Sequence, residues 1–168
     1  AGPIYFNAAI TGGGGLVTAG NDVILNRAAL NTNNIGAITI NSGRLFVFNT
    51  LANINGSTVT VNAGTLGFAI SAATNTLTNS VVLKSGGGLA NRLGTLVATN
   101  VTLASGTNIF NADDAVTTAL IVSGSALTLT NDLTIQVGGV NASAGAVILS
   151  NAISGAFGLT KTAGGSLG

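Results

Sequence analysis

The sequence has very little charge. Its 168 residues include five lysines and arginines and four acids, so only 5% of residues are charged and the formal net charge is +1. About a quarter of residues are charged in an ordinary soluble domain. Nucleic acid binding requires clustered lysine and arginine, so this composition argues against a nucleic acid partner. Histidine and glutamate are absent, which leaves few groups for acid–base catalysis.

Cysteine is also absent, which excludes a disulfide framework and a thiolate metal site. No run of eighteen apolar residues occurs, so no segment is predicted to span a bilayer as a helix. The chain begins without methionine and without a basic, apolar leader, and it stops just after an aliphatic residue of a repeat. We therefore expect a processed product or a piece of a longer protein.

Glycine, asparagine and threonine make up about two-fifths of the chain, and 46% of residues are hydrophobic. Disordered segments have low hydrophobicity or strong net charge, and this chain has neither. Valine, isoleucine, leucine and threonine dominate, which favours strands. Strong helix formers such as glutamate, methionine and glutamine are nearly absent.

A short phrase returns about every twenty residues: alternating aliphatic residues, a small residue, a glycine and another aliphatic residue. Clear copies lie at residues 38–45, 59–66 and 101–106. A period of this length is typical of stacked repeat architectures. Glycine tolerates the positive φ of a tight corner, so the glycine of each copy is predicted to turn one strand into the next. These corner glycines are Gly43, Gly64, Gly86, Gly106, Gly124, Gly145 and Gly165.

The phrase predicts short strands with alternating inward and outward side chains, as in residues 59–61. A second strand follows the glycine, as in residues 45–47. A third, weaker strand is expected around Leu77, Leu96 and Val116 and at residues 133–137. Because each coil can pair with the next about 4.8 Å away, we predict an all-β parallel β-solenoid. It has about 20 residues and three short strands per coil, in roughly seven to eight coils.

The whole chain, residues 1–168, is predicted to be one solenoid segment. Residues 1–37 contain less regular copies of the phrase and residues 38–168 contain regular ones. No polar capping helix is evident at either end, and open sheet edges favour association. Few charges oppose close packing, so we expect end-to-end or lateral self-association.

The last stretch, residues 153–167, resembles the autotransporter-associated β-strand repeat, whose typical pattern is I-x-G-x-G-G-L-T-K-x-G-x-G-x-L. The residues that match this pattern are Gly155, Gly158, Leu159, Thr160, Lys161, Gly165 and Leu167. Phe157 and Ala163 replace usual glycines. The resemblance implies a right-handed parallel β-helix in a secreted or surface-exposed bacterial protein, with a passenger, adhesin or fibre role. It carries no catalytic residue to this chain.

One arrangement of charged residues invites a functional interpretation. Asp114 and Asp132 each lie eight residues after a corner glycine, and Arg92 lies six after another. In a solenoid these three would form an outward column, and two stacked carboxylates can bind a cation or act as an acid/base pair. The favoured interpretation is a solvated corner, so no catalytic, cofactor-binding or metal-ligating residue is assigned and no cofactor is expected.

Two further patterns concern polar residues. Several asparagines fall at a similar distance after their glycines, which predicts a hydrogen-bonded column more readily than a sugar-binding face; they are Asn49, Asn91, Asn111, Asn131 and Asn151. Strict alternation from Leu159 would turn Lys161 inward, so we expect the strand to break there and Lys161 to reach solvent.

These observations favour a non-enzymatic, structural or adhesive extracellular β-solenoid, working as a rigid stalk or fibre on a bacterial surface or in a secreted protein. Its expected partners are further copies and host or environmental surfaces, including polysaccharide. One alternative is a carbohydrate-active or carbohydrate-binding β-helix domain. A second is an ice-binding solenoid, although the threonine pairs do not share one phase of the repeat.

Overall fold

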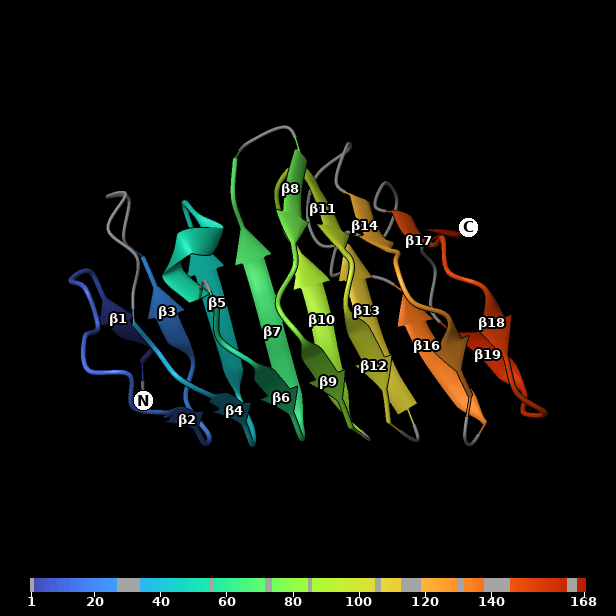
Figure 1. Cartoon of the computed structure of the whole chain (residues 1–168), viewed down its shortest axis with the longest axis horizontal. Coiled ribbons are helices and arrows are strands. Elements are labelled where there is room, and N and C mark those ends of the chain that lie inside the picture. Colours follow the sequence, from blue (N-terminus) through green and yellow to red (C-terminus); the bar gives the residue numbers. More distant parts are fainter. Residues whose placement is uncertain are drawn as a thin grey trace.

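Short β-strands stacked side by side along one long axis make up more than half of the described residues (Figure 1). The computed structural model describes residues 2–26, 34–54, 56–71, 74–84, 86–104, 107–112, 119–129, 132–137, 146–162 and 166–168. Every strand pairing within these ranges is parallel, and the partners lie about one coil apart in sequence. The prediction of an all-β solenoid with parallel strands is therefore confirmed.

One sheet contains the strands that carry the repeated phrase. Its strands in chain order are β2 (Leu16–Thr18), β4 (Ile38–Ile40), β6 (Val59–Val61), β9 (Val81–Leu83) and β12 (Val101–Leu103). Their first residues are stacked, at intervals of 22, 21, 22 and 20 residues. This part of the chain forms about five turns with a spacing near 22 residues, slightly longer than the predicted 20.

The largest sheet has eight strands and runs the length of the molecule. In order they are β1 (Ile4–Phe6), β3 (Val23–Leu25), β5 (Arg44–Phe48), β7 (Gly64–Ala69), β10 (Gly87–Asn91), β13 (Thr107–Ala112), β16 (Leu133–Val137) and β19 (Leu159–Thr162). The strands expected after the corner glycines, at residues 45–47 and 66–68, belong to it.

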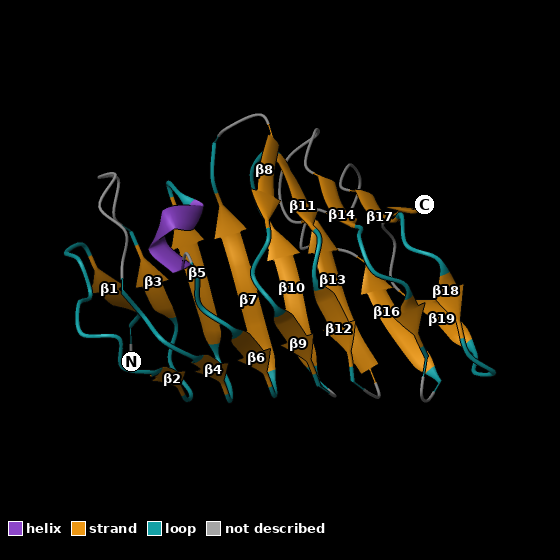
Figure 2. Cartoon of the chain, in the orientation of Figure 1, coloured by secondary structure: helices purple, strands orange, loops and turns teal. Residues whose placement is uncertain are grey.

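A third sheet begins further along the chain. Its strands in chain order are β8 (Thr74–Leu77), β11 (Thr95–Ala98), β14 (Ala119–Val122), β17 (Ala146–Leu149) and β20 (Ser166–Leu167). Between β5 and β6 the chain instead forms a 3-10 turn, η1 (Leu51–Ile54), the helical segment in Figure 2. A two-stranded sheet pairs β15 (Leu127–Thr128) with β18 (Ile153–Ser154).

Aliphatic side chains from the three larger sheets meet in one core inside the coils. Val59 and Val61 point inward and are at most 1% exposed, whereas Thr60 between them is partly exposed. The same alternation gives β4 and β9 two buried ends and a partly exposed centre. β-branched residues fit this pleated, half-buried environment, which explains their abundance in the phrase.

The repeat lengthens toward the C-terminal half, and this overturns two strand assignments. The interval is 24 residues from Leu96 to Leu120 and 27 from Leu120 to Val147. A prediction that counts a constant number of residues per coil therefore assigns the later strands to the wrong sheets. Residues 120–122 precede the predicted corner glycine Gly124 and are therefore expected to match residues 101–103, but they belong to β14 in the third sheet. Residues 133–137, predicted as a third strand, form β16 of the eight-stranded sheet.

The strand containing Lys161 also differs from the prediction. β19 continues through Lys161 without a break, and all four of its residues are exposed. Lys161 is level with Ile135 of β16, which is fully buried. The lysine reaches solvent because β19 is the last strand of its sheet, so no described coil covers it.

Candidate functional site

Three of the predicted corner glycines lie where the chain turns from a strand of the β2–β12 sheet into the eight-stranded sheet. Gly43, Gly64 and Gly86 have φ values of 74°, 93° and 84°. A Cβ added at Gly64 would lie 2.2 Å from the carbonyl oxygen of Gly43 in the previous coil. Glycine is needed there both for its conformation and for the close approach of two backbones.

Gly124 occupies a different corner from those three. It follows β14 and has a φ of 100°, and a Cβ there would lie 2.0 Å from the carbonyl oxygen of Thr99. It therefore turns the chain from the third sheet toward β15. Gly106, Gly145 and Gly165 lie outside the described residues.

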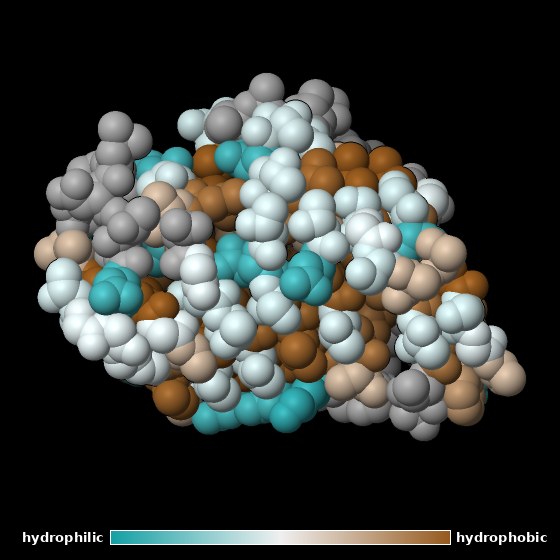
Figure 3. All heavy atoms as spheres, in the orientation of Figure 1, coloured by the Kyte–Doolittle hydropathy of each residue, from teal (hydrophilic) through white to brown (hydrophobic). Residues whose placement is uncertain are grey.

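Asparagine side chains link successive coils in two short rows. In the first, Asn49 Nδ2 donates to Asn26 Oδ1 at 3.0 Å, and Asn26 Nδ2 donates to Asn7 Oδ1 at 3.2 Å. In the second, Asn62 Nδ2 donates to Asn41 Oδ1 at 2.7 Å. Figure 3 shows a hydrophilic band along the lower edge of the molecule, where Figure 1 places the ends of β4, β6 and β9. These contacts hold successive coils in register.

The asparagine column predicted from glycine spacing does not form as such. Asn91 ends β10, level with Phe68, and its Nδ2 donates to the carbonyl oxygens of Gly94 and Ala119, both at 2.9 Å. Asn151 follows β17 and donates to the carbonyl oxygen of Ser125. Asn111 lies in β13 and Asn131 lies outside the described residues. Asn49, Asn91 and Asn111 therefore lie near the carboxyl ends of strands in the eight-stranded sheet but out of register with one another, whereas Asn151 lies after a strand of the third sheet.

The predicted charged column is not assembled by the two members that the structure describes. Arg92 follows the last residue of β10, whereas Asp132 precedes the first residue of β16. β10 and β16 are both in register with β13. Arg92 therefore lies at the carboxyl ends of the strands and Asp132 at their amino ends, on opposite sides of the sheet. Asp132 Oδ1 instead accepts a hydrogen bond of 2.7 Å from the N–H of Gly158. Asp114 lies outside the described residues.

One ion pair links adjacent coils on the surface. The Arg44 guanidinium donates to both carboxylate oxygens of Asp22, and it also lies over the Phe46 ring, 5.1 Å from the centroid. The hydrogen bonds from Arg44 hold the pKa of Asp22 below its usual value, against a smaller opposing effect of burial. Both side chains are partly exposed, so this pair contributes little to stability.

The outward positions of the β2–β12 sheet test the threonine face that ice binding would need. One residue per strand points outward, and these residues are stacked in register as Val17, Thr39, Thr60, Val82 and Thr102. Valine interrupts the column twice. The column is also one side chain wide, because the flanking residues of each strand point into the core.

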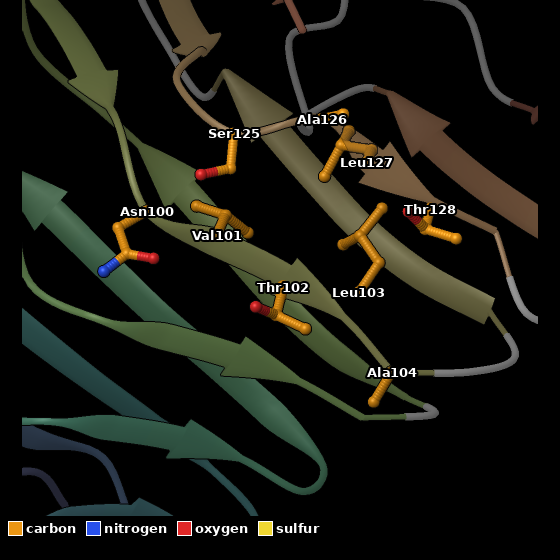
Figure 4. Close-up of a pocket in the computed structure, with 9 residues that line it drawn as sticks. All are labelled: Asn100, Val101, Thr102, Leu103, Ala104, Ser125, Ala126, Leu127 and Thr128. Atoms are coloured by element: carbon orange, nitrogen blue, oxygen red, sulfur yellow. The ribbon is translucent and has the colours of Figure 1, made fainter. Parts of the chain in front are cut away.

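A cleft opens on the outside of the solenoid between residues 100–104 and residues 125–128 (Figure 4). It encloses about 400 Å³, which is within the range of small-ligand sites, about 300–1,000 Å³. Its rim carries Asn100, Thr102, Ser125 and Thr128, and the aliphatic side chains of β12 and Leu127 lie deeper. No sequence pattern indicates this cleft, because it depends on how two strands stack.

Within the described residues, no group of three or more histidine, cysteine, aspartate or glutamate side chains lies close enough to hold a metal ion. The same residues include no helix with the length and apolarity needed to cross a bilayer. No protein-family profile, curated protein or solved structure matches the chain.

Proposed function

We propose that this chain is a structural β-solenoid segment, a rigid spacer within a secreted or surface-exposed bacterial protein, without a catalytic role. One observation carries the proposal: the glycines and asparagines that recur along the chain make contacts between successive coils. The glycines at the corners admit the backbone of the neighbouring coil, as at Gly64. The asparagines donate to groups one coil away, as from Asn49 to Asn26. Such residues maintain the stack itself, and stacked repeats act as extended, quasi-one-dimensional supports.

The finer architecture belongs to the same proposal. Along residues 81–122 the chain visits the β2–β12 sheet, the eight-stranded sheet and the third sheet in turn, and then repeats the cycle. This order supports three strands per coil, and the eight strands of the largest sheet support roughly seven to eight coils. The right-handed winding in the proposal follows from the resemblance to the autotransporter-associated repeat. The bacterial surface location follows from the resemblance of residues 153–167 to the autotransporter-associated repeat.

The two ends of the described stack support self-association. β1 and β19 each pair on one side only, and peptide groups on open edges can accept a further strand. Large apolar side chains are exposed nearby: Tyr5 is 57% exposed and Phe157 is 46% exposed. We propose that copies of the solenoid associate end to end, which buries these side chains and continues the eight-stranded sheet.

Electron microscopy and sedimentation velocity over a range of concentrations test this proposal. We expect filaments to form as the concentration rises. Phe157→Lys, which places a charge at one end, is expected to leave mostly monomers at concentrations where the wild type assembles. Leu93→Lys is the matched control, because Leu93 is 41% exposed but lies between the two ends.

Dispersed monomers of the wild type at every concentration would contradict the fibre role. Equal loss of assembly in both variants would point to a general effect of charge rather than to end contacts. The alternative interpretations have weaker support, since Arg92 and Asp132 lie apart and the outward column mixes valine with threonine.

A further inference from the structure

The stacking of strands is interrupted at one place, between β12 and β15. β12 is the last strand of its five-stranded sheet and pairs only with β9. β15 takes the corresponding place after the next strand of the third sheet, yet it pairs only with β18. The described strand pairings do not include one between β12 and β15. The cleft of about 400 Å³ lies between these two strands.

The lengths of two connections explain the interruption. Two residues, 99 and 100, connect β11 to β12, whereas four residues, 123–126, connect β14 to β15. β11 and β14 are paired in register, so both connections start at the same level of the third sheet. In the longer connection, the backbone of Gly124 lies close to the carbonyl oxygen of Thr99, and the two additional residues carry β15 away from the position in which it would pair with β12.

Peptide groups on both strands face this cleft. The N–H of Val81 donates to the carbonyl of Asn100 at 2.9 Å, and the N–H of Ala104 donates to the carbonyl of Leu83 at 2.8 Å. Peptide groups alternate in direction along a strand, so those of Val101 and Leu103 point away from β9, toward β15.

The same reasoning applies to β15. The N–H groups of Leu127 and Leu129 donate to the carbonyls of Ala152 and Ser154, at 2.9 Å and 2.8 Å. The peptide groups of Ala126 and Thr128 are therefore turned toward β12. Two strand edges with alternating donors and acceptors thus flank one cleft.

The side chains of the cleft agree with this geometry. Val101 and Leu103 are each 8% exposed, whereas Val81 and Leu83, one coil earlier, are fully buried. In Figure 4 these two side chains of β12 lie on the side of Leu127, while Thr102 projects away from it. The residues lining the cleft include no charged or aromatic side chain. A charged ligand would gain no ion pair there, and a sugar would gain no stacking surface.

We propose that this cleft binds an extended, uncharged peptide strand with alternating aliphatic and hydroxyl side chains, by adding it between β12 and β15. Strand addition to sheet edges is an established mode of peptide recognition, in which main-chain hydrogen bonds provide affinity. A seated strand sets β12 and β15 about 9.6 Å apart, twice the ordinary strand spacing. The four-residue connection before β15 gives that strand the length to move. The site extends the spacer role, because it attaches a partner chain to the side of the rod.

Nuclear magnetic resonance tests the proposal with a probe taken from the sheet itself, the acetylated and amidated peptide Thr-Val-Thr-Val-Asn of residues 58–62. In the free chain the amides of Val101, Leu103 and Thr128 should exchange rapidly with solvent, whereas the amide of Leu83 should be protected. Added peptide should shift and protect the first three. The same peptide N-methylated at both valines should fail to do so, because it lacks two of the required donors.

A deletion of Ser125 and Ala126 provides a second test. It shortens the connection to two residues, so β15 should pair directly with β12, protect Val101 and Leu103 without peptide and abolish peptide binding. The double substitution Ser125→Gly and Ala126→Gly keeps the connection length and should retain binding. If the deletion variant fails to fold, the titration of the wild-type chain still decides the question.

Four outcomes would overturn the proposal. The amides of Val101 and Leu103 could be protected in the free chain, which would mean that the two strands already pair. Millimolar peptide could leave them unshifted, or the methylated peptide could bind equally well. A neutral tetrasaccharide that shifts these amides when the peptide does not would assign the cleft to carbohydrate. None of these results depends on filament formation. The spacer proposal is therefore tested separately, by electron microscopy and sedimentation velocity.

Discussion

At the scale of single residues, the fold depends on a few positions where the backbones of successive coils nearly touch. Gly64 is the clearest, because both its φ of 93° and the carbonyl oxygen of Gly43 exclude a side chain. Asn49 is the one described non-glycine residue with positive φ, at 67°, and its side chain bonds to the preceding coil. Asparagine tolerates this conformation better than most residues.

Gly64→Ala is predicted to destabilise the chain far more than Gly56→Ala. Gly56 also has a positive φ, of 76°, but nothing lies within 4 Å of a Cβ added there. The control should cost about 1–2 kcal/mol for the left-handed conformation alone. Gly64→Ala should cost at least about 2 kcal/mol more, because backbone must also shift. Urea denaturation followed by circular dichroism measures both, and equal costs would contradict the close stacking of Gly43 on Gly64.

The ion pair of Asp22 and Arg44 gives a small dependence of stability on pH. The folded chain lowers the pKa of Asp22 from an unfolded value of about 3.9. The pair therefore stabilises the fold above that pH, and its contribution is lost as the pH falls through the lower, folded pKa. Because both groups are partly exposed, Asp22→Asn should reduce the free energy of unfolding at pH 7 by less than about 1 kcal/mol.

Denaturation of the wild type and Asp22→Asn at pH 7 and at pH 2.5 checks this prediction. The difference between them should shrink at the lower pH and in 1 M salt, which screens the pair. A difference that grows on acidification would show that the carboxyl is stabilised in its protonated form.

At the scale of strands, local pattern predicted structure well where the repeat length is constant. The alternation in residues 38–40, 59–61 and 101–103 placed strands and their inward faces correctly. Assignment to sheets became wrong at residues 120–122, because the interval there lengthens to 24 and then 27 residues. A single sequence contains the strand pattern but not the lengths of the connections, which decide the sheet that each strand joins.

The cleft between β12 and β15 shows the same limit. Its lining residues are ordinary for this chain, and two additional residues in one connection create it. The prediction of a charged column was wrong for a related reason. Arg92 and Asp132 were aligned by counting from glycines, and Gly124 turned out to serve a different corner from Gly86.

The contribution of the core is tested on β7. Phe68 is fully buried among aliphatic side chains, so Phe68→Ala should cost about 3–5 kcal/mol. Phe157→Ala is the matched control, because that side chain is 46% exposed and its removal should change stability by less than about 0.5 kcal/mol. Chemical denaturation at low protein concentration measures both. Similar small effects would show that β7 does not contribute to a packed core.

At the scale of the whole molecule, stacked coils produce an elongated body whose length is set by the number of strands. Each strand contacts its two neighbours, so stability is a sum of nearest-neighbour contacts and the coils act as a stiff series. This stiffness is what a spacer requires.

The most direct test of a rigid solenoid spacer is a distance measurement between its two ends by double electron–electron resonance. The chain has no cysteine, so spin labels can be placed at Tyr5→Cys and Thr162→Cys alone. These residues lie in the first and last of eight stacked strands, so the account predicts a narrow distribution near about 34 Å at about 4.8 Å per strand. A broad distribution, or one centred far below that length, would contradict it.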